Sequence, residues 1–150
     1  MKASSGRAPK PVTLSRANYE ALSSFRYAVR RYLAFAEAGA RSVGLTSLQH
    51  QALLAIKTHS FSGPISVGDL AAELLVKHHS AVELVSRLEK AGLARKDGDP
   101  QDRRRVLVSL TDAGEAVLAA LSANNLRELR LIAPAFSGLL GQLDKLGAAD

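Results

Sequence analysis

The hydrophobic pattern of this chain changes its period near Gly92, and this change constrains the fold more than any other feature. Before Gly92, apolar residues recur every three or four positions, which is typical of amphipathic helices. After it, Leu93–Lys96 and Arg105–Leu110 alternate with a period of about two, which predicts two short strands. The turn-rich segment Asp97–Asp102 lies between them. The sequence therefore predicts a mainly α domain with a small β-hairpin, whose tip is charged.

Start and stop signals divide the helical pattern into four helices before the hairpin and two after it. Thr46–Gln49 and Ser66–Asp69 resemble capping boxes, which open helices. Gly39 and Gly44 are expected to bracket a loop, Gly92 is expected to end the fourth helix, and Pro134 is expected to break the fifth from the sixth. The expected helices cover about residues 15–38, 46–60, 66–75, 78–91, 111–133 and 136–146.

The fourth expected helix has one apolar and one polar face. The residues expected to face the core are Ala81, Leu84, Val85, Leu88 and Ala91. The residues expected to face outward are His79, Val82, Glu83, Ser86 and Lys90.

Length and composition favour one globular domain. The 150 residues are 47% hydrophobic and include no cysteine, which excludes disulfides and thiolate metal sites. We find no apolar run long enough for a membrane span and no secretory h-region, so we expect a cytoplasmic protein without a membrane partner. Residues 1–13 are expected to form a basic mobile tail and residues 14–150 a single domain.

The net charge of +6 is concentrated in two stretches. Residues 1–31 hold seven Lys or Arg against one acid, and residues 75–110 hold eight against five. A basic excess favours an anionic partner, although it also occurs for solubility alone. The second stretch coincides with the fourth helix and the hairpin.

Three helices followed by a two-stranded hairpin predict a winged helix-turn-helix, with a DNA-binding lobe over about residues 46–111. In that fold the last helix enters the major groove of DNA and the hairpin reaches the neighbouring backbone and minor groove. The flanking helices, about residues 15–38 and 113–146, lie outside this unit and are broadly apolar. We expect them to be dimerisation helices of a homodimer.

The hairpin carries the sequence LARKDGDPQDRRRVLVSLTDAG, residues 93–114, which resembles the wing of the multiple-antibiotic-resistance regulator (MarR) family. The preceding VSRLEKAGL, residues 85–93, resembles the end of that family's recognition helix. The resemblance follows the order of elements over about residues 15–146. The pattern D-x-x-D-R-R, followed by a strand and L-T-x-x-G, is its most specific part.

The resemblance implies a transcriptional regulator, most often a repressor, that binds palindromic operators in double-stranded DNA as a homodimer. It also implies release by a small phenolic or aromatic effector, whose site we leave unassigned. Arg104 matches the wing-tip arginine that enters the minor groove, and Asp102 matches the acid that holds it. A bidentate pair between the two side chains would fix the guanidinium. Glu83 departs from the family, which often has a basic residue there.

We expect the DNA contacts in the turn before the fourth helix, on that helix and in the hairpin. The candidates are Lys77, His78, His79, Ser80, Val82, Glu83, Arg87, Arg95, Lys96, Asp102, Arg103, Arg104 and Arg105. Several of them have a plainer alternative, namely a solvated charge or, for the histidines, a helix cap.

No catalytic motif, phosphate-binding loop or dinucleotide fingerprint is present, so we expect no enzyme and no cofactor. A metal site built from His78 and His79 with His50 or His59 has no pair spaced i, i+4 on one helix face, and we expect none. Two functions stay open as alternatives: a winged helix for protein–protein contact, and a DNA-architectural protein.

Overall fold

A computed structural model describes residues 13–147 of the chain as two compact units. The central unit consists of Arg31–Leu131. The terminal unit consists of residues 13–30 and 132–147 within the described range. All but one residue of the expected basic tail lie outside the described residues.

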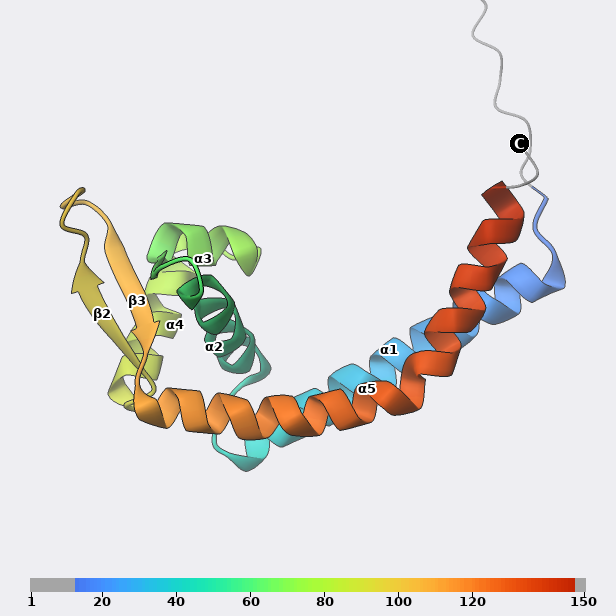
Figure 1. Ribbon diagram of the computed structural model, residues 1–150, viewed down its shortest axis with the longest axis horizontal. Coiled ribbons are helices and arrows are strands. Elements are labelled where there is room, and N and C mark those ends of the chain that lie inside the picture. Colours follow the sequence, from blue (N-terminus) through green and yellow to red (C-terminus); the bar gives the residue numbers. More distant parts are fainter. Residues whose placement is uncertain (1–12, 148–150) are drawn as a thin grey trace, which may run out of the picture. The chain divides into compact units, whose positions relative to one another are not determined.

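Five helices and three strands occur between residues 13 and 147 (Figure 1). Their order in the chain is α1 Arg16–Ser42, α2 Ser47–Ser60, β1 Ile65–Ser66, α3 Val67–Glu73, α4 His78–Lys90, β2 Ala94–Gly98, β3 Val106–Leu110 and α5 Asp112–Gly147. The mainly α fold with a hairpin is confirmed.

The caps that the sequence predicts are present. The Thr46 side chain accepts the N–H of Gln49 at 3.1 Å, and the Gln49 side chain accepts the N–H of Thr46 at 2.8 Å, which completes a capping box for α2. The Ser66 hydroxyl accepts the N–H of Asp69 at 3.1 Å and so caps α3. Gly92 has φ +74° directly after the cap residue of α4, a conformation that glycine adopts without strain.

The three strands form one antiparallel sheet in the order β1-β3-β2. The β2–β3 hairpin pairs Ala94 with Leu110 at its base and Gly98 with Val106 near its tip (Figure 1). β1 pairs Ile65 with Val108 and joins the hairpin to the start of α3. The expected hairpin is therefore confirmed, and β1 is an addition that periodicity did not predict.

The core of the central unit lies between α2, α3, α4 and the sheet. Its fully buried large side chains are Leu53, Ile56, Ile65, Leu70, Val85, Leu88 and Val108. Four of the five residues that we expected on the inner face of α4 are buried, whereas Ala91 is exposed because it follows the last residue of the helix. This packing fixes which face of α4 remains in contact with solvent.

Two expected helix boundaries are wrong. α1 continues through Gly39 to Ser42, and a Cβ on Gly39 would lie 3.7 Å from the Leu121 side chain, so the position is packed inside the central unit rather than in a loop. α5 continues through Pro134, so the expected fifth and sixth helices are one. A proline inside a long helix removes one backbone hydrogen bond while the remaining ladder persists.

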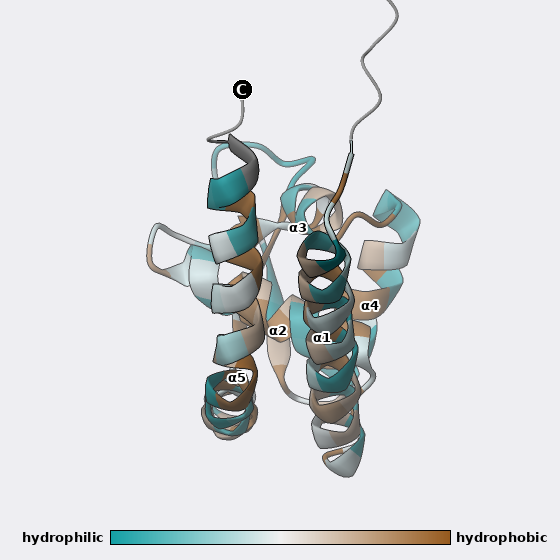
Figure 2. Ribbon diagram, turned by 90° about the vertical axis from the view of Figure 1, so that its right-hand side faces the viewer, coloured by the Kyte–Doolittle hydropathy of each residue, from teal (hydrophilic) through white to brown (hydrophobic). Residues whose placement is uncertain are grey.

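The terminal unit buries few side chains. Phe25 and Phe136 meet edge to face with ring centroids 4.9 Å apart, and the Asn18 amide donates to Gln142 Oε1 at 3.3 Å. Both helices carry hydrophobic as well as hydrophilic residues along their length (Figure 2). Large apolar side chains that remain exposed in this unit include Tyr19, Leu22, Tyr27, Leu140 and Leu143.

Candidate nucleic-acid interface

The first turn of α4 is open to solvent. His78 and His79 are exposed and Ser80 is half-buried. Lys77 occupies the N-cap position, and its side chain makes no capping hydrogen bond. The first N–H groups of a helix have no partner within the helix and attract anions. This end of α4 therefore presents N–H groups that no cap side chain occupies.

α4 separates two depressions on the surface of the central unit. One, of about 380 Å³, lies toward the start of α2 and is lined by residues that include Ser80, Glu83 and Arg87. The other, of about 400 Å³, lies toward α3 and the hairpin, and is lined by residues that include His78 and Val82. The predicted contact residues of α4 therefore divide between its two flanks.

Glu83 and Arg87 lie one helical turn apart on α4, and the Arg87 guanidinium donates to Glu83 Oε1. Both side chains are more than half exposed, at 63% and 61%. The Glu83 carboxylate therefore orients an arginine of the same helix. An exposed pair of this spacing contributes only about 0.3–0.5 kcal/mol to stability, which leaves Arg87 available to an external partner.

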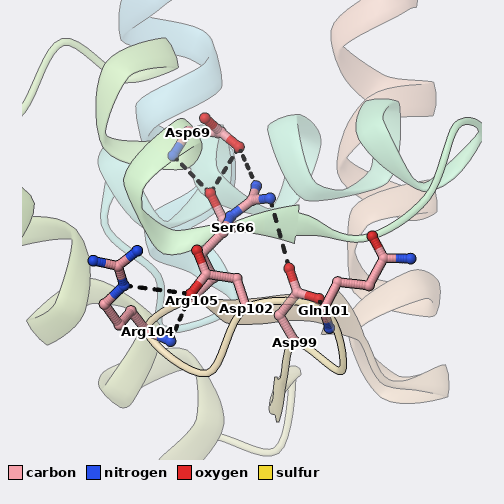
Figure 3. Close-up of polar contacts among 7 residues, drawn as sticks. All are labelled: Ser66, Asp69, Asp99, Gln101, Asp102, Arg104 and Arg105. Atoms are coloured by element: carbon pink, nitrogen blue, oxygen red, sulfur yellow. Dashed lines mark hydrogen bonds and ion pairs between the residues drawn. The ribbon is translucent and has the colours of Figure 1, made fainter.

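The loop that joins β2 and β3, residues 99–105, is called the wing loop below. Arg104 projects from it with 93% of its side chain exposed (Figure 3). Asp102 Oδ1 accepts the backbone N–H of Arg104 at 3.0 Å, whereas the Arg104 Nε lies 3.6 Å from that oxygen. The expected bidentate pair is wrong: Asp102 shapes the turn through the backbone and only weakly restrains the guanidinium.

Arg105 lies next to Arg104 but points elsewhere (Figure 3). Its Nη2 lies 3.0 Å from Asp69 Oδ2, in the first turn of α3, and its Nη1 lies 3.6 Å from Asp99 Oδ2, at the start of the wing loop. This pair could not be predicted from local sequence patterns, because Asp69 and Arg105 are 36 residues apart. Only the three-dimensional fold brings them together.

The strand β2 places its two basic residues on opposite faces of the hairpin, as the period of a strand requires. Lys96 lines the depression next to α4, and its ammonium lies 3.0 Å from Glu89 Oε2. Arg95 lines a depression on the other face and donates to the Ser109 hydroxyl at 3.1 Å. Lys96 is therefore grouped with α4, and Arg95 is not.

The L-T-x-x-G motif anchors the base of the hairpin. The Thr111 hydroxyl donates to the carbonyl of Gly92 at 2.6 Å, and the same oxygen accepts the N–H of Gly114 at 3.1 Å. A Cβ on Gly114 would lie 2.0 Å from the carbonyl oxygen of Leu93. The glycine is thus required because the backbone at the start of β2 packs directly against α5.

The basic residues of this surface differ in how many acids surround them. Arg87, Arg95, Lys96, Arg104 and Arg105 each lie within 4.0 Å of a carboxylate. Lys77 and Arg103 are exposed, and neither has an acid within that distance among residues 13–147. These two side chains carry the least compensated positive charge of the candidate set.

Between residues 13 and 147, no three His, Cys, Asp or Glu side chains gather in a way that could hold a metal ion. Over the same range, no helix is both long enough and apolar enough to cross a membrane.

The sequence profile of the MarR family matches residues 43–105, from the end of α1 to the end of the wing loop. This stretch contains α4 and the wing loop, whose geometry is described above. The resemblance to the MarR family that the sequence predicts is therefore confirmed over residues 43–105. The winged-helix fold is confirmed by the arrangement of helices and strands in the central unit.

The curated relatives include a repressor and an activator of transcription. The HTH-type transcriptional repressor NicR of Pseudomonas putida is 35% identical over 96 residues, which are 64% of this chain and 59% of the relative. The transcriptional activatory protein BadR of Rhodopseudomonas palustris is 35% identical over 92 residues, which are 59% of this chain and 53% of the relative. The chain thus spans little more than half the length of these relatives.

A solved structure extends the similarity to the outer helices. A MarR family transcription regulator of known crystal structure is 26% identical in sequence to this chain. Its TM-score is 0.66, and the match covers 87% of this chain and 85% of the regulator.

Proposed function

We propose that this protein is a sequence-specific regulator of transcription that binds double-stranded DNA through α4 and the wing loop. The observation that carries the proposal is the wing loop itself, in which a turn held by Asp102 presents an arginine side chain that is 93% exposed. A narrow minor groove concentrates negative potential and attracts an inserted arginine. The proposed interface comprises the thirteen residues predicted from the sequence, of which Arg105 supports the wing loop instead of contacting DNA.

Two sets of residues at successive positions along α4 support a division of labour. The first turn of α4, with Lys77, His78 and His79, supplies N–H groups and side chains for phosphates, which set the position of the helix. Val82 and the Glu83–Arg87 pair lie farther along the exposed face, where base edges are read. In this proposal an arginine held by a glutamate reads the bases.

We propose that the protein acts as a homodimer that binds palindromic operators. The terminal unit leaves large apolar side chains exposed, among them Tyr19 at 60% and Tyr27 at 58%. Apolar surface of this extent marks an interface, and a two-fold axis would place two copies of α4 about 34 Å apart, one turn of DNA.

Light scattering during size-exclusion chromatography tests the dimer. The chain has a mass of 15.9 kDa, and we expect twice that value at micromolar concentration. Leu22→Glu should lower the measured mass toward that of one chain, whereas the neighbouring Ser23→Glu should leave the dimer intact. A wild-type mass near that of a single chain would exclude the dimer.

Selection of genomic fragments bound by the purified protein tests DNA recognition. We expect enrichment of fragments that share a palindrome with half-sites about one helical turn apart. Fragments enriched no more than random DNA would favour the alternatives, a module for protein–protein contact or an architectural protein.

Repression is the proposed direction of regulation, with activation as the second candidate because BadR is an activatory protein. A reporter assay with the selected promoter distinguishes them, since deletion of the regulator raises expression in one case and lowers it in the other. We further propose a small phenolic or aromatic effector that releases the DNA. The proposed function is binding without catalysis, and its proposed location is the cytoplasm.

A further inference from the structure

Arg105 joins both ends of the wing loop to α3. Its guanidinium lies between two carboxylates, with Nη2 3.0 Å from Asp69 Oδ2 and Nη1 3.6 Å from Asp99 Oδ2 (Figure 3). Its backbone carbonyl also accepts the N–H of Asp99 at 3.2 Å, which closes the loop. A single residue therefore links the start of the loop, its end and the first turn of α3.

Each of the two carboxylates also accepts a hydrogen bond from a residue close to it in the chain. Asp69 Oδ2 accepts the hydroxyl of Ser66 at 2.7 Å, and Ser66 is 95% buried at the start of α3. The Asp99 side chain is only 11% exposed, and its Oδ1 accepts the N–H of Gln101 at 2.9 Å. Fixed acceptors favour a single position for the guanidinium, since less side-chain entropy is lost on pairing.

We propose that Arg105 is a positioning residue, which holds the wing loop against α3 and contacts no phosphate. This inference rests on the proposed DNA-binding function. Arg105 carries one positive charge and lies near two negative ones, so the cluster of Arg105, Asp69 and Asp99 has no net positive charge to offer to DNA. Its contribution is to fix the direction in which the loop presents Arg104.

The two roles of Arg105 predict opposite effects at Asp69. If Arg105 contacted a phosphate, Asp69 would compete for the guanidinium and repel DNA, so Asp69→Asn would strengthen binding. If Arg105 holds the loop, Asp69→Asn removes its anchor and weakens binding. The asparagine keeps an oxygen that can accept the Ser66 hydroxyl, so the cap of α3 is retained.

The test is a double-mutant cycle on the full-length protein with a selected DNA duplex and fluorescence anisotropy. We expect Arg105→Gln and Asp69→Asn each to weaken binding about 3- to 10-fold, as expected for loss of an exposed ion pair on each of two wing loops. The double variant should bind DNA with about the same affinity as the single variant of lower affinity, because both changes break the same link.

Arg103→Gln is the matched control, since Arg103 is exposed and has no acid within 4.0 Å among residues 13–147. Loss of a phosphate contact lowers the slope of log K against log salt by about 0.9 per contact. We expect Arg103→Gln to lower this slope and Arg105→Gln to leave it unchanged. A slope lowered equally by both variants would overturn the proposal, as would tighter binding by Asp69→Asn.

Hydrogen exchange separates a failure of this inference from a failure of the proposed function. Peptides that cover residues 99–105 should exchange faster in Arg105→Gln and in Asp69→Asn than in the wild type, with equal melting temperatures. Unchanged exchange would overturn the link even where DNA binding is observed. If the wild type binds no duplex and both variants still exchange faster than the wild type, the DNA-binding function is refuted and the link between Arg105 and Asp69 is retained.

Discussion

Arg104 and Arg105 are adjacent in the sequence, but their side chains have different surroundings. Arg104 is almost fully exposed at the turn, and Arg105 bridges two carboxylates. In the proposed function, the run of three arginines therefore contains one side chain for insertion into the minor groove, one for positioning the wing loop and, in Arg103, one with little compensation by acids. Sequence composition alone assigns the same charge to all three.

Arg104→Ala should weaken binding to the selected DNA about 5- to 150-fold per half-site contact, an effect of about 1–3 kcal/mol. The melting temperature should stay near that of the wild type, because an exposed side chain contributes less than about 0.5 kcal/mol to folding. Asp102→Ala should weaken binding less, and Asp102→Asn least, because its amide oxygen can still accept the N–H of Arg104. Anisotropy titrations with a melting curve for each variant check this. Wild-type affinity in folded Arg104→Ala would contradict the role of the wing loop.

Leu75 adopts φ +55° in the turn between α3 and α4, and its side chain is 93% exposed. A left-handed conformation costs a residue with a Cβ about 1–2 kcal/mol. Leu75→Gly should therefore raise the free energy of unfolding by about 0.5–1 kcal/mol, after the greater freedom of glycine in the unfolded chain is subtracted. Leu75→Ala retains the Cβ and should change stability little. Urea denaturation measures both, and destabilised Leu75→Gly would show that the side chain makes a stabilising contact.

Burial lowers the pKa of His50, which lies on the inner face of α2. Because its pKa is lower in the folded protein than in the unfolded chain, the unfolded state binds more protons below about pH 6.5. The free energy of unfolding should therefore fall as the pH falls from 7 to 5. His50→Leu should reduce this fall, because it removes the group whose pKa burial lowers. Equal pH dependence of the wild type and His50→Leu would contradict the assignment.

At the scale of elements, two glycines near the starts of helices differ in whether a Cβ would fit. Gly114→Ala would place a Cβ 2.0 Å from the Leu93 carbonyl oxygen, so we expect destabilisation of at least about 3 kcal/mol. In Gly68→Ala the Cβ would lie 3.9 Å from Ser66 Oγ, an ordinary contact, and the gain in helix propensity should stabilise by about 0.5–1 kcal/mol. Denaturant titration checks both, and a stable Gly114→Ala would show that the hairpin base can move away from α5.

The sequence predicted those elements that are determined by residues close together in the chain. The caps of α2 and α3, the end of α4 at Gly92 and the hairpin all depend on residues within a few positions of one another. β1 was missed because two residues have no detectable period, and it exists only through its pairing with β3. The break at Pro134 was wrong because one lost hydrogen bond does not end a helix of 36 residues.

The residues of the candidate site could be predicted from the sequence, but the contacts between their side chains could not. The wing motif identified the loop, yet neither the pairing of Arg105 with Asp69 nor that of Glu83 with Arg87 was anticipated. The first links residues far apart in the chain. The second depends on rotamers, which a helical wheel does not specify.

At the scale of the whole molecule, the proposed function divides the two tasks between the two units. In this proposal the exposed basic residues of α4 and the wing loop contact DNA, and the exposed aromatic and aliphatic side chains of the terminal unit contact a second copy of the chain. A dimer would therefore present two copies of each DNA-binding element, and its affinity should reflect contacts from both.

The most direct test of DNA binding through this basic surface is the affinity for a selected duplex as a function of salt concentration. Lys and Arg that neutralise phosphates release condensed counterions, so six to ten contacts per dimer should weaken binding about 10³- to 10⁵-fold between about 50 and 200 mM salt. Anisotropy titrations at several salt concentrations give this slope. A steep linear decrease in log K is the result that the account predicts, and an affinity that does not change with salt would contradict it.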